Sequence, residues 1–424
     1  MRGSMQGSVA TRGRFAAVCS ALVLAALAIP AAASGDLIYT APDDQSSGFF
    51  CSESQPCALV IGINLAAADD DEVLLAPGNY ETSAELEIAN GTTNVTIRPR
   101  DPGTRPVIVS TASPALQLSG AGTTVRGIDI SHNSPSGTGL FGLASSTIRN
   151  VVSISNGDTP CQMANGLMTD TTCIATATSG RAMRVSLASG NATTTVRNAT
   201  LFATGSNGTG IYASASDSDA SVSLDVASTI AVGDGFDVET DTGTGGSVDV
   251  ALAFSNFETR AVDAGATVTA PTSANNQTEE PIFTGFGLEQ DPDSPTVDAG
   301  IVDAETGTTD VYGDARPQGV ANDIGADELF DTVAPQTRIT KKPKRKTKSR
   351  RAKFKFASNE PALDFVCKFD KGIFGGGEYE SCSASITLRK VKPGRHTMSV
   401  KAIDTNGNID QTPAKYRWKV KKKG

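Results

Sequence analysis

Lysine is missing from the first 330 residues of this 424-residue chain, and all 17 lysines follow them. Residues 1–330 hold 13 Lys and Arg against 38 Asp and Glu, whereas residues 331–424 hold 24 against 8. The two parts therefore carry net charges of −25 and +16, which together give the −9 of the whole chain. This change predicts two domains of different chemistry that join near residue 330.

Aromatic residues are also scarce, at 5% of the chain with a single tryptophan. Small and β-branched residues dominate instead, mainly Thr, Ser, Ala, Val, Gly and Asn. This composition argues against a thick aromatic core. It suits thin, stacked coils with small-residue turns.

No long apolar run follows residue 34, so the sequence predicts no transmembrane segment. Three arginines precede the apolar run Phe15–Pro30, and the small residues Ala31–Ser34 follow it. This order is typical of a secretory signal peptide, here residues 1–34, with cleavage after Ala33 or Ser34. A membrane anchor is the alternative, but the run is short for one. We expect a secreted protein, extracellular or at the cell surface.

One short pattern returns along the acidic part of the chain. It reads TTVRGIDIS at Thr123–Ser131, STIRN at Ser146–Asn150, TTVRN at Thr194–Asn198 and VTIRP at Val95–Pro99. The apolar residues before the arginines fall at 97, 125, 148 and 196, so the spacings are 28, 23 and 48 residues, the last about two copies long. Repeats of this length are typical of a solenoid, whose units bury their apolar faces against their neighbours.

Each copy reads as a strand, a bend and a second strand. The apolar residue should point inward and the arginine outward, because side chains alternate along a strand. The next position holds Gly127, Asn150 or Asn198, residue types that readily take positive φ. These strands, bends and a period of about 25 residues resemble the right-handed parallel β-helix, or pectin-lyase-like, family.

Both ends of the repeats carry features similar to secreted members of that family. Ala58–Ala68 has helical apolar spacing and resembles an N-terminal cap, and we interpret the acidic Asp69–Glu72 after it as a turn rather than a calcium site. The sequences SPTVDAG at Ser294–Gly300 and DVYGDARPQGVANDIGADE at Asp310–Glu328 resemble the segment that ends such helices in bacterial proteins.

The basic part of the chain predicts a small antiparallel sandwich and resembles an Ig-like or fibronectin-type module. The expected strands are Lys353–Ala357, Phe365–Phe369, Ser385–Leu388, His396–Ile403 and Tyr416–Val420. The fold class is therefore all-β. We assign residues 1–34 to the signal peptide, 35–330 to a right-handed parallel β-helix and 331–424 to a basic Ig-like β-sandwich.

Six cysteines remain after cleavage, an even number in an exported chain, which favours disulfides over a metal or thiol site. The expected local pairs are Cys51 with Cys57, Cys161 with Cys173, and Cys367 with Cys382. The second pair interrupts the repeat, and we interpret it as a stapled loop that projects from one coil. The third should staple neighbouring strands of a hairpin.

The resemblance does not fix an activity, because pectin-lyase-like folds include lyases, hydrolases and proteins without catalysis. Lyases of this type need a cationic Arg or Lys base, usually with calcium, and the G-H-G motif of polygalacturonases is missing here. The helix does offer a column of outward arginines, Arg126, Arg149 and Arg197, which suits the carboxylates of an acidic polysaccharide. The alternative is that they are solvated and pair with nearby aspartates.

Two other groups of residues are candidates. Asp234, Asp237, Glu239 and Asp241 alternate along the sequence, and calcium is the ligand they would suit, although a structural or solvating role is favoured. The basic run Lys341–Lys355 would attract an anionic polymer. Its leading cations are Lys341, Lys342, Lys344, Arg345 and Lys346.

We therefore expect a non-catalytic monomer without a cofactor that binds polysaccharide or an anionic cell-wall polymer. Nucleic acid is not an expected partner, because the sequence holds no recognition motif and the chain is expected to be exported. The alternative function is a polysaccharide lyase or glycoside hydrolase acting on acidic glycans.

Overall fold

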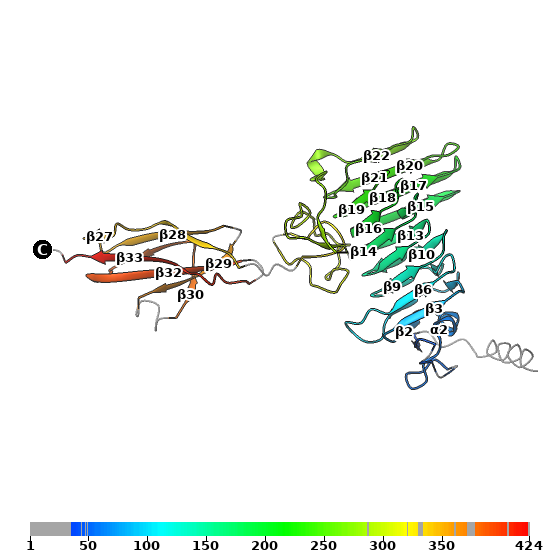
Figure 1. Cartoon of the computed structure of the whole chain (residues 1–424), viewed down its shortest axis with the longest axis horizontal. Helices are drawn as coiled ribbons and strands as arrows, with labels where there is room; N and C mark the ends of the chain where they lie inside the picture. The colour runs from blue at the N-terminus through cyan, green and yellow to red at the C-terminus, as the bar shows by residue number, and fades with distance from the viewer. Residues whose placement is uncertain are drawn as a thin grey trace, which may run out of the picture.

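The computed structural model describes residues 35–422, apart from 44, 47, 49, 286–287, 320, 330–333, 360–361, 371–377 and 405–406. The predicted signal peptide, residues 1–34, lies outside the described residues. Within them, no helix is long and apolar enough to cross a membrane. The fold class is all-β, as predicted, with a parallel β-helix followed by a β-sandwich (Figure 1).

Two of the three faces of the β-helix belong to one 15-stranded parallel sheet, because β14 and β16 each run through the corner between these faces. The strands of this sheet are β1 (Leu37–Thr40), β2 (Glu72–Leu75), β3 (Asn79–Thr82), β5 (Thr96–Pro99), β6 (Val107–Ser110), β8 (Thr124–Arg126), β9 (Asp129–His132), β11 (Ser146–Arg149), β12 (Val152–Ser155), β14 (Gly166–Ala175), β16 (Gly190–Ala203), β18 (Ala220–Ala227), β19 (Ile230–Gly233), β21 (Ser247–Ala253) and β23 (Ala266–Thr269).

The third face is an eight-stranded parallel sheet. Its strands are β4 (Leu86–Ile88), β7 (Leu116–Leu118), β10 (Thr138–Gly142), β13 (Thr159–Met163), β15 (Arg181–Leu187), β17 (Thr209–Ala215), β20 (Phe236–Asp241) and β22 (Arg260–Ala261). After β23 come the short 3-10 helix η1 (Thr272–Ala274) and the antiparallel pair β24 (Phe283–Thr284) and β25 (Glu289–Gln290).

The repeated apolar position stacks along the inside of the helix. Ile97, Val125 and Ile148 are direct neighbours on β5, β8 and β11, and Met168 supplies the missing copy between Ile148 and Val196. The 48-residue spacing therefore holds two coils, of 20 and 28 residues. All five side chains are fully buried, and each contributes roughly 2 kcal/mol through its removal from water.

The residue after the repeated arginine forms a corner, as predicted. Gly127, Asn150 and Asn198 have φ of 69°, 51° and 48°, in the left-handed region. Asp170 and Ser228 occupy the equivalent corner in two coils that the sequence pattern does not reveal, with φ of 50° and 51°. A line of left-handed corners thus runs along one side of the helix.

The N-terminal end is covered as expected. Helix α2 (Leu59–Leu65) buries Leu59 and Ile63 against the first coils, and the predicted disulfide Cys51–Cys57 lies beside it. The first coil strand is β1, which precedes the cap helix in the sequence and pairs with β2.

The Cys161–Cys173 disulfide forms as predicted, but the interpretation as a projecting loop is wrong. Cys161 lies on β13 between Leu140 and Met183, and Cys173 lies on β14 beside Leu201, so both occupy core positions of one coil. Both are fully buried. The bond crosses the interior between two sheets and replaces two apolar side chains, which is why the repeat looks interrupted there.

The C-terminal domain is a sandwich with its own aromatic core around Phe354 and Trp418. One sheet contains β26 (Thr337–Lys341), β28 (Ala352–Ser358) and β31 (Ser385–Leu388), and the other contains β27 (Lys346–Thr347), β29 (Ala362–Phe369), β30 (Glu380–Cys382), β32 (Gly394–Asp404) and β33 (Ala414–Val420). The five expected strands are confirmed, while β26, β27 and β30 were missed. The Cys367–Cys382 disulfide joins the adjacent strands β29 and β30, as predicted.

Replacing Cys161 and Cys173 with alanine should lower the free energy of unfolding of the β-helix by about 3 kcal/mol through loss of the cross-link alone. Far-UV circular dichroism during urea unfolding follows mainly the helix, whereas fluorescence of Trp418, the single tryptophan, follows the sandwich. The dichroism midpoint should fall while the fluorescence midpoint stays constant. The matched Cys367→Ala, Cys382→Ala variant should do the opposite, and an unchanged dichroism midpoint in the first variant would contradict a disulfide in the helix core.

Candidate functional site

Residues 294–329, which we call the strap, pack along the line of left-handed corners. The strap leaves the Ser228 corner at Ile301, whose N–H donates to Ser228 Oγ over 2.8 Å. It reaches the Asn150 corner at Thr309, whose carbonyl accepts from Asn150 Nδ2 over 3.2 Å. It then returns to Ser228, where the N–H of Gly325 donates to the Ser228 carbonyl over 2.8 Å. The segment that was expected to end the helix therefore lies against its side.

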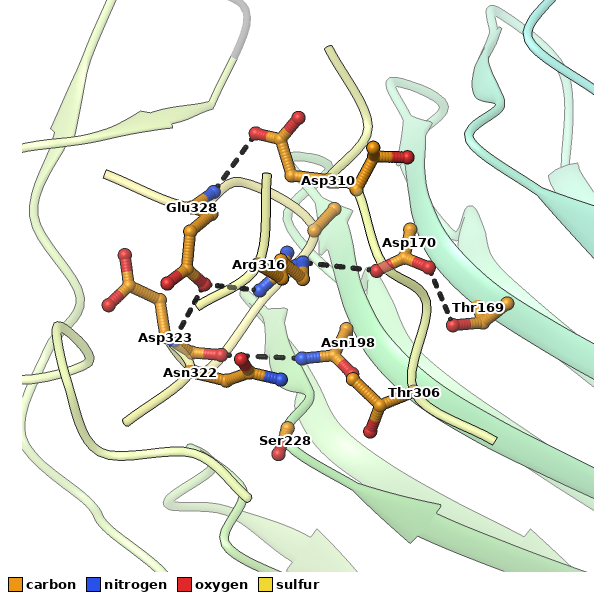
Figure 2. Close-up of polar contacts among 12 residues, drawn as sticks. Thr169, Asp170, Asn198, Ser228, Thr306, Asp310, Arg316, Asn322, Asp323 and Glu328 are labelled. Carbon is orange, nitrogen blue, oxygen red and sulfur yellow. Dashed lines mark hydrogen bonds and ion pairs between the residues drawn. The ribbon is translucent and has the colours of Figure 1, made fainter. Parts of the chain in front are cut away.

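A buried ion cluster fixes the strap to the middle corner (Figure 2). Arg316 Nε lies 3.1 Å from Asp170 Oδ1, and Arg316 Nη1 lies 2.7 Å from Glu328 Oε2. The third nitrogen, Nη2, donates to the carbonyl of Gly325 over 2.8 Å. All three charged side chains are essentially unexposed. Gly307 packs so closely on Asp170 that a side chain there would collide with the carboxylate.

Other carboxylates in the cluster hold backbone N–H groups of the strap. Asp310 Oδ1 accepts from the N–H groups of Tyr312, Gly313 and Asp314 at 2.7–2.9 Å. Asp323 accepts from the N–H groups of residues 298 and 329, both at 2.7 Å. The bonds to Asp310 fold the tip of the strap, Val311–Gly313, into a tight turn.

The tip of the strap and the neighbouring coil enclose a cleft of about 320 Å³. Its lining residues are Arg98, Pro99, Arg100, Asp101, Pro102, Gly103, Thr104, Arg105, Arg126, Gly127, Asn150, Val311, Tyr312 and Gly313. Four of the ten arginines between residues 35 and 330 therefore meet at one place. This stretch has 38 acidic residues, so the cleft gathers arginines on an otherwise acidic domain.

Three of the four arginines already have partners. Arg98 pairs with Glu72 at 2.6 Å, Arg100 with Asp101 at 2.8 Å, and Arg105 with Asp129 at 2.5 Å. Arg105 also donates to the carbonyls of Val311 and Asn150, which ties the strap tip to the coil.

Arg126 differs from these three. It is exposed, and its guanidinium has no hydrogen-bond or ion-pair partner among the described residues. Nearby, Tyr312 is 36% exposed and lines the same cleft. The arrangement therefore offers one free guanidinium, with five N–H donors, beside an aromatic surface.

Of the other two members of the predicted arginine column, Arg149 lies beside Arg126, whereas Arg197 is covered. Arg149 is its direct neighbour on β11 and is half-buried, but Thr169 occupies the next coil. Arg197 is only 6% exposed and pairs with Asp225 at 2.7 Å and with Asp303 of the strap at 2.6 Å. The expectation that Arg197 faces a ligand is wrong because the strap covers it.

The predicted acidic group near β20 is occupied in structural hydrogen bonds. Asp237 accepts from the N–H groups of Gly233, Glu258 and Thr259 at 2.6–2.9 Å. Glu239 accepts from the Thr209 hydroxyl, Asp241 accepts from the Tyr212 hydroxyl, and Asp234 is exposed. In the described part of the chain, no three His, Cys, Asp or Glu side chains are placed to hold a metal ion.

The leading cations of the basic run are exposed and lie along the segment that leads from one sheet of the sandwich to the other. Lys341 ends β26 and Lys346 begins β27. Lys342 lies over the ring of Tyr416, with 5.1 Å from Nζ to the ring centroid. Lys344 and Arg345 lie in the connection, where the Arg345 carbonyl accepts from the N–H of Lys419.

Sequence reasoning missed Arg98, Arg100 and Arg105 as members of the site. Their stretch, RPRDPGTR at Arg98–Arg105, carries three arginines in eight residues and is the visible signal of a basic turn. Tyr312 is separated from it by more than 200 residues, and the sequence offers no indication that the two meet. Compared with protein-family models and with curated proteins, the sequence matches none of them.

Burial raises the pKa of several carboxyl groups in the strap cluster. The pKa of Asp170 rises from 3.8 to about 6 and that of Asp323 to about 7, in both cases mainly because burial disfavours the charged form. A carboxyl group whose pKa is higher in the folded protein than in the unfolded chain stabilises the fold at low pH. Its full contribution is present at pH values below the unfolded pKa. That contribution is lost as the pH rises through the folded pKa.

The free energy of unfolding of the β-helix should therefore fall as the pH rises from about 4 to 7. The slope is about 1.4 kcal/mol per pH unit for each group while the pH lies between its unfolded and its folded pKa. Urea unfolding followed by circular dichroism at several pH values measures this slope. Asp323→Asn should make the slope shallower, whereas Asp249→Asn, at an exposed position on β21, should leave it unchanged. Equal slopes in all three proteins would contradict the assignment to the strap cluster.

Proposed function

We propose that this chain is an exported, non-catalytic protein that binds an acidic polysaccharide, and that Arg126 receives a carboxylate of the sugar chain. The observation that carries the proposal is the free guanidinium of Arg126 in a cleft with three further arginines. Carboxylate and guanidinium form two parallel hydrogen bonds, which gives both attraction and orientation.

The surroundings of Arg126 support a sugar acid rather than a small inorganic anion. The exposed ring of Tyr312 offers an apolar surface for one side of a sugar ring. Asp101 and the backbone of the 98–105 turn supply acceptors and donors for hydroxyl groups. A uronic acid presents all three features together, namely a carboxylate, an apolar ring face and hydroxyls.

Export is supported by the three disulfides, which form and persist in oxidising compartments. The order of residues 1–34 supports it independently. Within this proposal, the β-helix is of the pectin-lyase-like, right-handed type and the sandwich is an Ig-like module. A signal peptide would direct the chain to export, so that the mature protein reaches the medium or the cell surface.

A polysaccharide lyase on the same helix is the alternative function. An unpaired arginine beside a uronate is the kind of base that lyase chemistry uses, so Arg126 would serve either function. Lyase activity leaves an unsaturated uronate that absorbs in the ultraviolet, and hydrolysis releases reducing ends. Incubating the chain with polyuronates, with and without calcium, separates both activities from binding.

The Arg126→Gln variant should bind a short oligogalacturonate about tenfold more weakly than the parent, because a charge-assisted bidentate contact becomes a neutral one. Isothermal titration calorimetry of the full chain at low salt measures the difference. Arg126→Lys should recover only part of the affinity, since an ammonium group cannot form the paired contact.

The matched control is Arg260→Gln, which removes the same charge from an exposed position on β22, outside the cleft. This variant should bind like the parent. If Arg126→Gln binds as tightly as the parent, the cleft is not the sugar site. If both variants weaken binding equally, only net charge matters and the proposed contact is wrong.

A further inference from the structure

The outer face of the five-stranded sheet of the sandwich is strongly basic. Along β29, β32 and β33, alternate residues such as Phe369, Val400 and Trp418 fill the core, so the residues between them point outward. The cations at these outward positions are Lys368, Arg395, Lys401, Lys415, Arg417 and Lys419.

Three cations on this sheet lie in one row across neighbouring strands. Lys346 on β27 is the direct partner of Lys419 on β33, and Lys419 is the direct partner of Arg395 on β32. All three are exposed. Neighbouring strands lie about 4.8 Å apart, so three like charges follow one another at close range. Such pairs destabilise a sheet unless something neutralises them.

No carboxylate within the described residues neutralises the row. None of its members has an ion pair within 4.0 Å, and the same holds for Lys368, Lys401, Lys415 and Arg417. In the helix, by comparison, five of the ten arginines have carboxylate partners, namely those at 98, 100, 105, 197 and 316. The cations on this face of the sandwich are therefore available to pair with the carboxylates of a ligand.

The rest of the face continues the row. Lys368 and Lys401 lie 5.8 and 5.4 Å from the ring centroid of Tyr379. Lys415 on β33 is the direct partner of Ser399, which is also the partner of Lys368 on the other side. An aromatic ring and further cations thus lie beside the row on the same sheet.

We propose that this face is a second docking surface, on which a linear acidic polysaccharide lies across β27, β33 and β32 with its carboxylates against Lys346, Lys419 and Arg395. The inference rests on the proposed function for the class of ligand but uses separate residues. A polymer with one carboxylate on each sugar matches a surface with one cation on each strand. The net charge of +16 on residues 331–424 attracts such a chain at long range.

This placement refines the interpretation of the basic run. Only Lys346 of its five leading cations belongs to the row, because β27 carries it into the sheet next to Lys419. The other four contribute to the general positive field. The surface that fits a polymer is built from three strands that are distant in the sequence, which a local charge run does not reveal.

The test compares two triple variants of the full chain. Lys346→Gln, Arg395→Gln and Lys419→Gln together remove the row. The control, Arg338→Gln, Lys353→Gln and Lys355→Gln, removes the same number and kinds of charges from outward strand positions of the other sheet. Affinity for polygalacturonate is measured at low and high salt, and Trp418 fluorescence reports the melting temperature of the sandwich.

Loss of the row should weaken polygalacturonate binding about tenfold, while the control changes it by about twofold or less. The melting temperature of the row variant should not fall, because cross-strand repulsion has been removed. Equal weakening in both variants, or no weakening in the row variant, would overturn the inference. Arg126→Gln keeps the row intact, so loss of oligogalacturonate binding in that variant alone tests the cleft and leaves this surface unaffected.

Discussion

The arrangement of the β-helix domain depends on one buried cation. Arg316 is removed from water between Asp170, at a corner of the coils, and Glu328, near the end of the strap. A buried guanidinium without its partners would cost about 3–5 kcal/mol, so the two carboxylates and the cation hold one another in place. The consequence is mechanical: the strap is fixed to the middle of the line of corners rather than only at its ends.

The position of the strap determines which corners remain open. From Ser228 to Asn150 the corner side chains donate or accept hydrogen bonds with the strap. The strap turns back at Val311–Gly313, where Asp310 holds the turn, so the Gly127 corner stays uncovered. The same device buries Arg197 and leaves Arg126 free, although both follow the same sequence pattern. The path of the strap, and not the repeated sequence, therefore decides which of the equivalent arginines stays exposed.

The coils could be predicted from the sequence because each is specified locally. Val125, Gly127 and their equivalents give the inward residue and the corner within a few positions. The coil at Met168 was missed because Thr169 and Asp170 stand where the other copies have arginine and then Gly or Asn. Cys161 and Cys173 were paired correctly, but the sequence did not predict that they lie in the core. Two cysteines stand at inward positions where the other coils have apolar residues, so the repeat pattern is lost there.

The candidate site was predicted only in part. Arg126 and the basic run were identified from their residue types, whereas the cleft needs contacts between Arg105 and Val311, 206 residues apart. The row of Lys346, Lys419 and Arg395 likewise depends on strand order. Contacts of this kind depend on how strands and loops pack after they have formed. They cannot be predicted from a pattern of residues that are neighbours in the sequence.

The central claim is that the 98–105 turn and the strap tip form one binding site for a uronate chain. Hydrogen–deuterium exchange of the full chain, with and without a short oligogalacturonate, tests it most directly. We expect slower exchange in both segments, residues 98–105 and 311–313, and unchanged exchange along the eight-stranded sheet. Protection that falls on the eight-stranded sheet, or on only one of the two segments, would contradict the account.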